Sequence, residues 1–157
     1  MKQPPAIREM RALSVMQPWA YCIAHKGKNV ENRPRTTHMR GTIAIHASAG
    51  RDPERFEWLK DDHNINLDPN TVPFGAIVAF ADIVDVITKK QVTGKTKKWF
   101  QGDYGYVLEN VVVLKKPIAV KGALSFWKLK GTVLKKCLEQ VPAGKRRRFK
   151  PFQHPPK

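Results

Sequence analysis

The sequence predicts an α+β fold, a small mixed β-barrel with two or three peripheral helices. Two observations support this prediction: short apolar segments with strand-like alternation are separated by Gly and Pro, and a few stretches carry helix start and stop signals. The 157 residues are enough for one domain with an ordinary core. We expect a loose N-terminal arm over residues 1–11, the barrel over residues 12–141, and a basic, disordered tail over residues 142–157.

The first elements follow from local signals. Leu13–Met16 is apolar and is expected to form a short strand. A helix is expected over residues 17–26, because Pro18 falls in its first turn and Gly27 lies just past its end. Val30–Arg33 is expected to form the next strand.

The remaining elements alternate between strand and helix patterns. Thr42–Ala47 alternates and predicts a core strand, and Asp52 can cap a helix that runs to about His63. Phe74–Ile87 is a long apolar run, which predicts a bent barrel strand. Further strands are expected at residues 104–114, 118–121 and 126–129, and a helix at residues 133–138.

Charge narrows the class of partner. The chain has 29 Lys and Arg against 13 Asp and Glu, a formal net charge of +16, and six of the 13 acidic residues lie within residues 52–68. Such a surface attracts polyanions, so nucleic acid is the expected partner. A generally solubilising basic surface is the alternative. Membrane binding is not expected, because no amphipathic anchor and no apolar run of about 18 residues is present.

The N-terminal residues, the cysteines and the spacing of possible metal ligands predict the compartment and the use of cofactors. The first residues lack the apolar centre of a secretory signal, so we expect a cytoplasmic protein, and we expect it to be a monomer. Cys22 and Cys137 lie in amphipathic surroundings and are expected to be reduced core thiols, although a disulfide remains an alternative. No metal-ligand spacing is present, and no cofactor is expected.

The most informative segment is the polar run Gly27–Arg33, which has apolar segments on both sides. Strand alternation places Glu31 and Arg33 on one face, close to Lys28. Charges packed between core elements are costly unless they are paired, so an ion pair, a ligand or catalysis must offset that cost. We favour ligand contact by these three residues. A catalytic role, with Glu31 as general base, and a purely structural role remain open.

Residues on both sides of this run are further candidates for ligand binding. Gln17 and Trp19 lie where a helix begins, and free backbone N–H groups there favour an anion. Trp19 could stack on a base, but we favour a role in closing the barrel end. Arg35, Thr37 and Arg40 follow the polar run and are expected to be exposed, where they suit phosphate contact.

Two later segments add candidates. His46 and Ser48 end a core strand, where they could line a cleft, although a lone His at such a position is usually a satisfied core residue. Lys97, Lys98 and Trp99 combine charge with an aromatic ring, a pattern typical of sites for single-stranded nucleic acid. The alternative for this segment is a solvated loop with Trp99 packed beneath it.

Several of these pieces together resemble a known family. In order along the chain they are Leu13–Ala20, Gly27–Arg33, Arg40–Ser48, Pro73–Val78, Tyr104–Leu108 and Val120–Gly122. This series resembles the ASCH domain (activating signal cointegrator homology), a relative of the PUA-type RNA-binding barrels, and it covers roughly residues 12–129. The resemblance implies a PUA-like β-barrel with peripheral helices that binds RNA.

The family also leaves other functions open. Small members that resemble amidohydrolases of N4-acetylcytidine carry Lys-x-x-Thr-x-Arg, whereas Glu31 stands here in place of the Thr. A carboxylate cannot do the work of a Thr hydroxyl without a change of mechanism. RNA binding is therefore our leading expectation. The alternatives are a ribonuclease or nucleoside amidohydrolase with Lys28, Glu31 and Arg33 as catalytic residues, and a transcription-coactivator-like adaptor.

Overall fold

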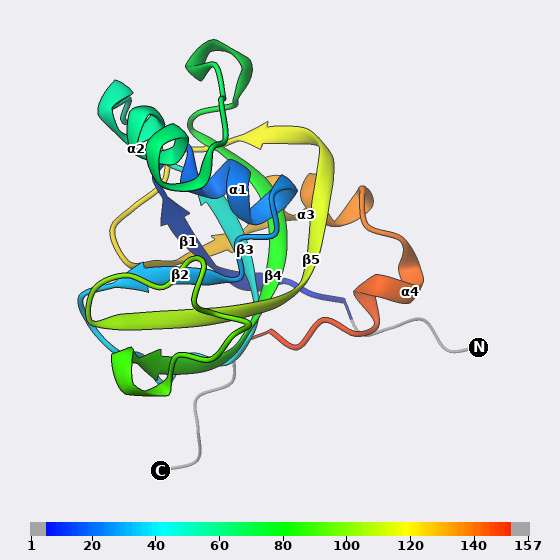
Figure 1. Cartoon of the computed structure of the whole chain (residues 1–157). Coiled ribbons are helices and arrows are strands. Elements are labelled where there is room, and N and C mark those ends of the chain that lie inside the picture. Colours follow the sequence, from blue (N-terminus) through cyan, green and yellow to red (C-terminus); the bar gives the residue numbers. More distant parts are fainter. Residues whose placement is uncertain (1–5, 152–157) are drawn as a thin grey trace.

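The computed structural model of the chain describes residues 6–151. Six strands form one curled sheet in the order β2-β5-β4-β3-β1-β6 (Figure 1). The strands are β1 (Glu9–Val15), β2 (Val30–Arg33), β3 (Gly41–Ala47), β4 (Ala76–Thr88), β5 (Tyr104–Ala119) and β6 (Phe126–Lys130). The helices are α1 (Trp19–His25), α2 (Pro53–His63), α3 (Gly131–Glu139) and α4 (Ala143–Arg146), with short 3₁₀ turns at Pro69–Thr71 and Lys89–Gln91.

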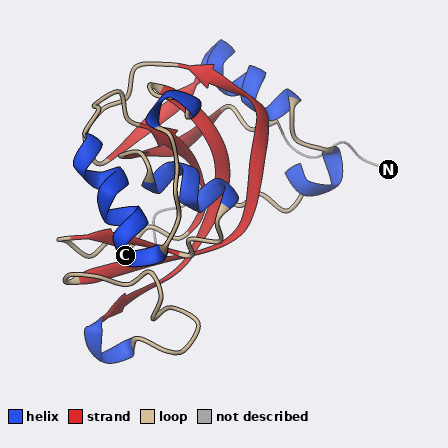
Figure 2. Ribbon diagram, turned by 45° about the horizontal axis from the view of Figure 1, so that its top comes forward, coloured by secondary structure: helices blue, strands red, loops and turns tan. Residues whose placement is uncertain are grey.

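The sheet is mixed and incompletely closed. β1 pairs in parallel with β3, and the other pairings are antiparallel. β2 and β6 are the two edges, so the sheet forms a half-barrel. The β4–β5 ladder contains three register shifts, and such irregularities allow long strands to bend as they do in Figure 2. This architecture confirms the predicted α+β fold with a small barrel-like sheet.

Alternation along the strands produces two cores, one on each face of the sheet. Leu13 and Ile45 pack with Ile23 of α1 on the inner face. Their neighbours Ala12 and Ala44 pack in a second cluster on the other face, which is covered by the apolar side of α3. The helices α1 and α3 therefore lie on opposite faces of the sheet.

A third cluster attaches α2 to the barrel. Leu59 of α2 packs with Cys22, Val30 and Trp99, all of them buried. The predicted start of α2 is confirmed, because Asp52 Oδ1 accepts a hydrogen bond from the Glu54 backbone N–H at 3.0 Å.

Both cysteines are free and buried, as expected for core thiols. Burial raises the pKa of each thiol, Cys22 and Cys137, to about 11. Both are therefore protonated near neutral pH and suited to apolar packing.

Three boundaries differ from the sequence-based expectation. β1 begins at Glu9, inside the predicted arm, because it pairs with β6 as far as Lys130. β5 continues to Ala119 as one strand, where the sequence predicted two.

The tail is the third difference. Residues 142–151 were expected to be disordered, but α4 forms there, and the Phe149 ring lies 5.0 Å from the Phe80 ring, centroid to centroid. The Thr42 backbone N–H donates to the Lys150 carbonyl at 2.7 Å. One aromatic side chain and a few backbone bonds thus hold a segment whose composition is strongly basic. Residues 1–5 of the predicted arm and 152–157 of the predicted tail lie outside the described residues. None of the helices within residues 6–151 is long and apolar enough to cross a membrane.

Candidate functional site

A cleft of about 1200 Å³ opens beside the end of β1 and the edge strand β2. The end of β5 and the segment between β5 and β6, together residues 119–125, form one wall. Side chains from α1, α2 and the segment before β5 contribute to the others. The lining includes Ser14, Met16, Trp19, Lys28, Glu31, Asn32, Arg33, His46, Ser48, Trp58, His63, Trp99, Gln101, Lys121, Gly122 and Leu124.

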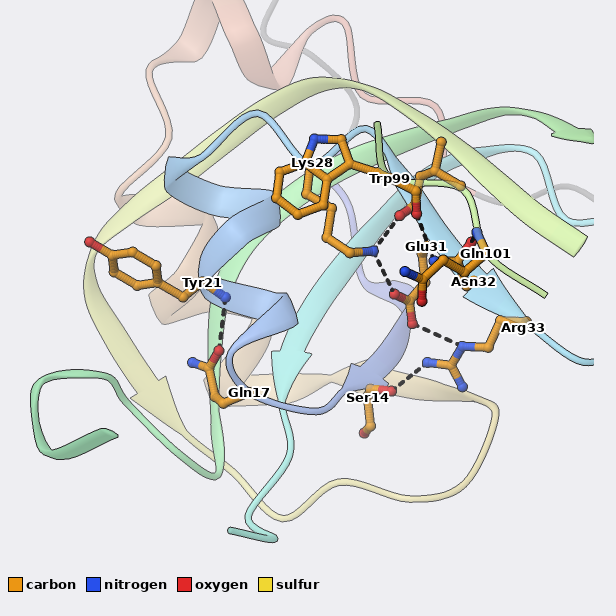
Figure 3. A network of polar contacts seen from close by, with 10 residues as sticks. Ser14, Gln17, Tyr21, Lys28, Glu31, Asn32, Arg33, Trp99 and Gln101 are labelled. Atoms are coloured by element: carbon orange, nitrogen blue, oxygen red, sulfur yellow. Dashed lines mark hydrogen bonds and ion pairs between the residues drawn. The ribbon is translucent and has the colours of Figure 1, made fainter. Parts of the chain in front are cut away.

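An ion-pair network joins the three charged residues of the polar run (Figure 3). Glu31 Oε1 lies 3.3 Å from Lys28 Nζ, and Glu31 Oε2 lies 3.0 Å from Arg33 Nε. Lys28 Nζ also donates to the Val30 carbonyl. Lys28 is only 3% exposed and Glu31 only 7%, so the pairing offsets the cost of burying both charges.

Arg33 is the most accessible charge of this network. Its Nη2 donates to the Ser14 carbonyl at 2.6 Å, and its side chain keeps 24% of its surface exposed. Nη1 takes part in none of the hydrogen bonds found among residues 6–151. The guanidinium is thus fixed in orientation and retains donors for an anionic or carbonyl ligand.

Asn32 fixes the aromatic wall of the cleft. Its Nδ2 donates to the Trp99 carbonyl and its Oδ1 accepts from the Gln101 N–H, both at 2.8 Å. The Trp99 ring in turn stacks on His63 of α2, with centroids 4.2 Å apart. Burial, followed by the charge of Lys98, lowers the pKa of His63, which favours the neutral ring.

A second set of polar contacts, the Ser14 network, also borders the cleft. Ser14 Oγ is 2.9 Å from His46 Nδ1, and His46 Nε2 is 2.8 Å from the Val120 carbonyl. Trp127 Nε1 donates to Ser14 Oγ at 3.1 Å. Burial is also the main cause that lowers the pKa of His46.

The structure brings together about half of the predicted site residues. Those that line the cleft are Trp19, Lys28, Glu31, Arg33, His46, Ser48 and Trp99. Trp19 is half-buried and packs against two of the core clusters, so it closes part of the barrel and also borders the cleft.

Gln17 does not line the cleft. It is buried, and its Nε2 donates to the Pro73 carbonyl at 2.8 Å. Its Oε1 accepts from the Tyr21 N–H at 2.8 Å (Figure 3). Its amide is therefore used to join α1 to the segment before β4, and no polar atom of the side chain is left for a ligand.

Five other predicted residues also lie outside the lining of the cleft. Arg40 donates to the carbonyls of Thr37 and Met39 and keeps its own loop in shape. Arg35 is exposed in the same loop. Lys97 and Lys98 are exposed beside a separate shallow depression near the end of α2.

Several residues of the cleft were missed by the sequence analysis, among them Ser14, Trp58, Lys121 and Leu124. Trp58 and Leu124 are 46% and 94% exposed, which is unusual for side chains of this size. The one local signal for Trp58 was its position, as a large aromatic residue within the acidic segment over residues 52–68. Ser14 could have been found only with its partner His46, which lies 32 positions away. Within residues 6–151, no group of three or more His, Cys, Asp or Glu is arranged to hold a metal ion.

Comparison with known proteins agrees with the motifs. Activating signal cointegrator 1 of Homo sapiens is 27% identical over 126 residues, and the Mus musculus protein of the same name is 26% identical over 126 residues. The resemblance to the ASCH family is confirmed. Each match covers 74% of this chain and 22% of the relative, so the chain spans about a fifth of the length of these proteins. No family model matches the chain. The ASCH resemblance is thus distant and concerns the domain alone.

Proposed function

We propose that this ASCH-like chain binds RNA in the cleft. One observation carries the proposal: the partly exposed guanidinium of Arg33, oriented by Glu31, shares a cleft with several indole rings. A fixed guanidinium suits a phosphate, and aromatic rings suit base faces. The formal charge of +16 supports an anionic partner of this kind.

The rim of the cleft favours unpaired nucleotides over a duplex. Met16, Trp58 and Leu124 are exposed large apolar side chains, and all three line the cleft. In a duplex the faces of the bases are stacked on each other, whereas in a single strand or loop they can pack on aromatic side chains. The proposed ligand is therefore single-stranded or looped RNA.

For the three charged residues we propose a positioning role rather than acid–base catalysis. Both carboxylate oxygens of Glu31 are already paired, and the ammonium group of Lys28 is buried behind it. This arrangement supports Glu31 as the residue that orders Arg33 for ligand contact. We propose a monomer as the binding unit, which light scattering of the purified chain would test.

The test is a salt titration of binding to a fluorescent single-stranded RNA. Affinity should fall with salt with a slope of about −0.7 per neutralised phosphate. Lys121→Ala, at the cleft, should reduce the slope by about 0.7. Lys135→Ala, an equally exposed Lys on α3, is the matched control and should leave affinity for a short RNA nearly unchanged. An affinity independent of salt, or equal effects of both variants, would contradict binding in the cleft.

A further inference from the structure

The Ser14 network has no role in the proposed RNA contacts. It joins four parts of the fold: Ser14 in β1, His46 in β3, Trp127 in β6, and Val120 in the segment after β5. Each contact is between 2.8 and 3.1 Å, within the normal range of hydrogen bonds.

The donors and acceptors of the Ser14 network determine which atom carries the proton in each of its hydrogen bonds. A backbone carbonyl only accepts, so His46 Nε2 must carry the proton that bonds to the Val120 oxygen. The other ring nitrogen, Nδ1, then has a free lone pair when the imidazole is neutral, and the Ser14 hydroxyl donates to it. The indole N–H of Trp127 only donates, so it occupies a lone pair on Ser14 Oγ.

The two reactive groups of the Ser14 network differ in burial. His46 is 2% exposed and borders the cleft, and the lowered pKa that results from its burial keeps the imidazole neutral near neutral pH. Ser14 is only partly buried and also lines the cleft. A neutral base is thus hydrogen-bonded to the hydroxyl of a residue that lines the cleft.

We propose that Ser14 is a nucleophile, with His46 as its general base, and that it gives the cleft an acyl-transfer activity on esters or amides. The arrangement has the three required parts: a hydroxyl, a base within hydrogen-bond distance, and the Val120 carbonyl that orients the base. Arg33 donates to the backbone carbonyl of Ser14, so a cation also lies next to the residue that carries the nucleophile.

The reaction balances with water as the only co-reactant. As Ser14 Oγ bonds to the acyl carbon, its proton moves to His46 Nδ1. The leaving alcohol or amine takes that proton as its bond to the acyl carbon breaks. Water then attacks the acyl carbon while His46 Nδ1 accepts one of its protons. As the bond between Ser14 Oγ and the acyl carbon breaks, His46 returns that proton to Oγ, which releases the carboxylic acid and restores Ser14. This activity does not depend on whether the cleft binds RNA.

The chain contains its own controls. It has three serines, Ser14, Ser48 and Ser125, and all three line the cleft. Within residues 6–151, Ser14 alone among them is hydrogen-bonded to a histidine. The three serines therefore border the same cleft, and only one of them has a base within hydrogen-bond distance.

The experiment treats the full-length chain with a small fluorophosphonate and maps the adduct by peptide mass spectrometry. We expect one adduct, at Ser14, absent in Ser14→Ala and unaffected by Lys135→Ala, which lies on α3 and does not line the cleft. His46→Gln keeps a donor for the Val120 carbonyl but has no basic nitrogen, and should slow labelling by about 100-fold or more. Trp127→Phe removes the N–H donor together with part of the ring, should slow labelling less than His46→Gln does, and serves if His46→Gln fails to fold.

The acyl step is tested with p-nitrophenyl acetate on the same proteins. Release of nitrophenolate by the wild type, lost in Ser14→Ala and kept in Lys135→Ala, would support the proposal. Three results would each overturn it: no adduct at Ser14 in the folded wild type, labelling that is equal at the three serines, or ester cleavage that is equal in wild type and Ser14→Ala.

Discussion

Arg33 Nη2 lies 2.6 Å from the backbone carbonyl oxygen of Ser14, and this bond joins the edge strand β2 to β1 although the two strands are not neighbours in the sheet. The contact lies on the side where the half-barrel is not closed by strand pairing. One side chain therefore connects the ion-pair network of the cleft to the strand that carries Ser14 (Figure 3). Changes at either end are expected to affect both.

Removing the central carboxylate should destabilise the fold. Glu31→Ala leaves Lys28 buried without its counter-charge and should lower the free energy of unfolding by on the order of 3 kcal/mol, measured by urea denaturation. The control is Asp85→Ala, which removes an exposed pair with Arg40 at 4.0 Å and should cost less than about 1 kcal/mol. Similar small losses in both variants would mean that the network is solvated.

Gly122 packs directly against the Ser14–His46 pair. A Cβ atom at this position would lie 2.6 Å from Ser14 Oγ and 2.5 Å from His46 Cε1. We expect Gly122→Ala to cost about 1–3 kcal/mol, because the ring, the hydroxyl or the cleft wall must move. A Cβ on Gly94 would meet no atom within 4 Å, so Gly94→Ala should melt within a few degrees of wild type. Equal melting temperatures for the two variants would contradict this packing.

Stability should depend on pH through His46. Burial lowers the pKa of this ring below its ordinary value near 6.5, so the unfolded chain takes up the proton first as the pH falls. Its contribution is therefore complete above about pH 6.5 and is lost as the pH falls toward the pKa of the folded state. Urea titrations at about pH 7.5 and pH 5 should show a larger loss for wild type than for His46→Gln. The lowered pKa of His63 acts in both proteins and cancels in the comparison. Equal losses would exclude His46 as the titrating group.

Trp58 should matter for binding and little for folding. Its side chain is 46% exposed, so Trp58→Ala should leave the melting temperature nearly unchanged. Loss of one stacked base is expected to weaken binding of single-stranded RNA by about 1–3 kcal/mol, measured by fluorescence anisotropy. Trp58→Phe retains a ring and should recover most of the affinity. If Trp58→Ala binds like wild type, the rim of the cleft is not a stacking surface.

Two adjacent residues after α4 are expected to have different roles: Phe149 contributes to stability, and Arg148 contributes positive charge. Phe149→Ala removes the ring that packs on Phe80 and should cost about 1–2 kcal/mol. Arg148 is exposed, so Arg148→Ala should change stability by less than about 0.5 kcal/mol and lower only the affinity for polyanions. Truncation before Ala143 is thus expected to weaken binding and also to reduce stability. A Phe149→Ala variant as stable as wild type would mean that this ring does not contribute to the stability of the fold.

Local signals predicted most of the fold. Asp52 followed by Pro53 is sufficient to place the start of α2, because both residues act on the backbone next to them. Strand alternation correctly placed Glu31 beside Arg33, and short spacing placed Lys28 within reach of the same carboxylate. These contacts join residues at most three positions apart, where backbone geometry decides the outcome.

Contacts between distant segments could not be predicted in this way. Asn32 meets the Trp99 carbonyl 67 positions away, and His46 meets the Val120 carbonyl 74 positions away. Both depend on the path of β5, which forms one bent strand where the sequence predicted two. Gln17 shows the converse error: its position before α1 suggested an anion site, but tertiary packing buries its amide against Pro73.

The separation of these segments along the chain has a thermodynamic consequence. The hydroxyl, imidazole and guanidinium groups of the cleft come from β1, β3 and β2, and the walls come from segments around Trp99 and Gly122. No short fragment contains the cleft, so any ligand must select the fully folded chain over every partly folded form. Occupancy and global folding are therefore linked equilibria, and a ligand at 100 times its dissociation constant would add about 2.7 kcal/mol to the stability of all six strands together.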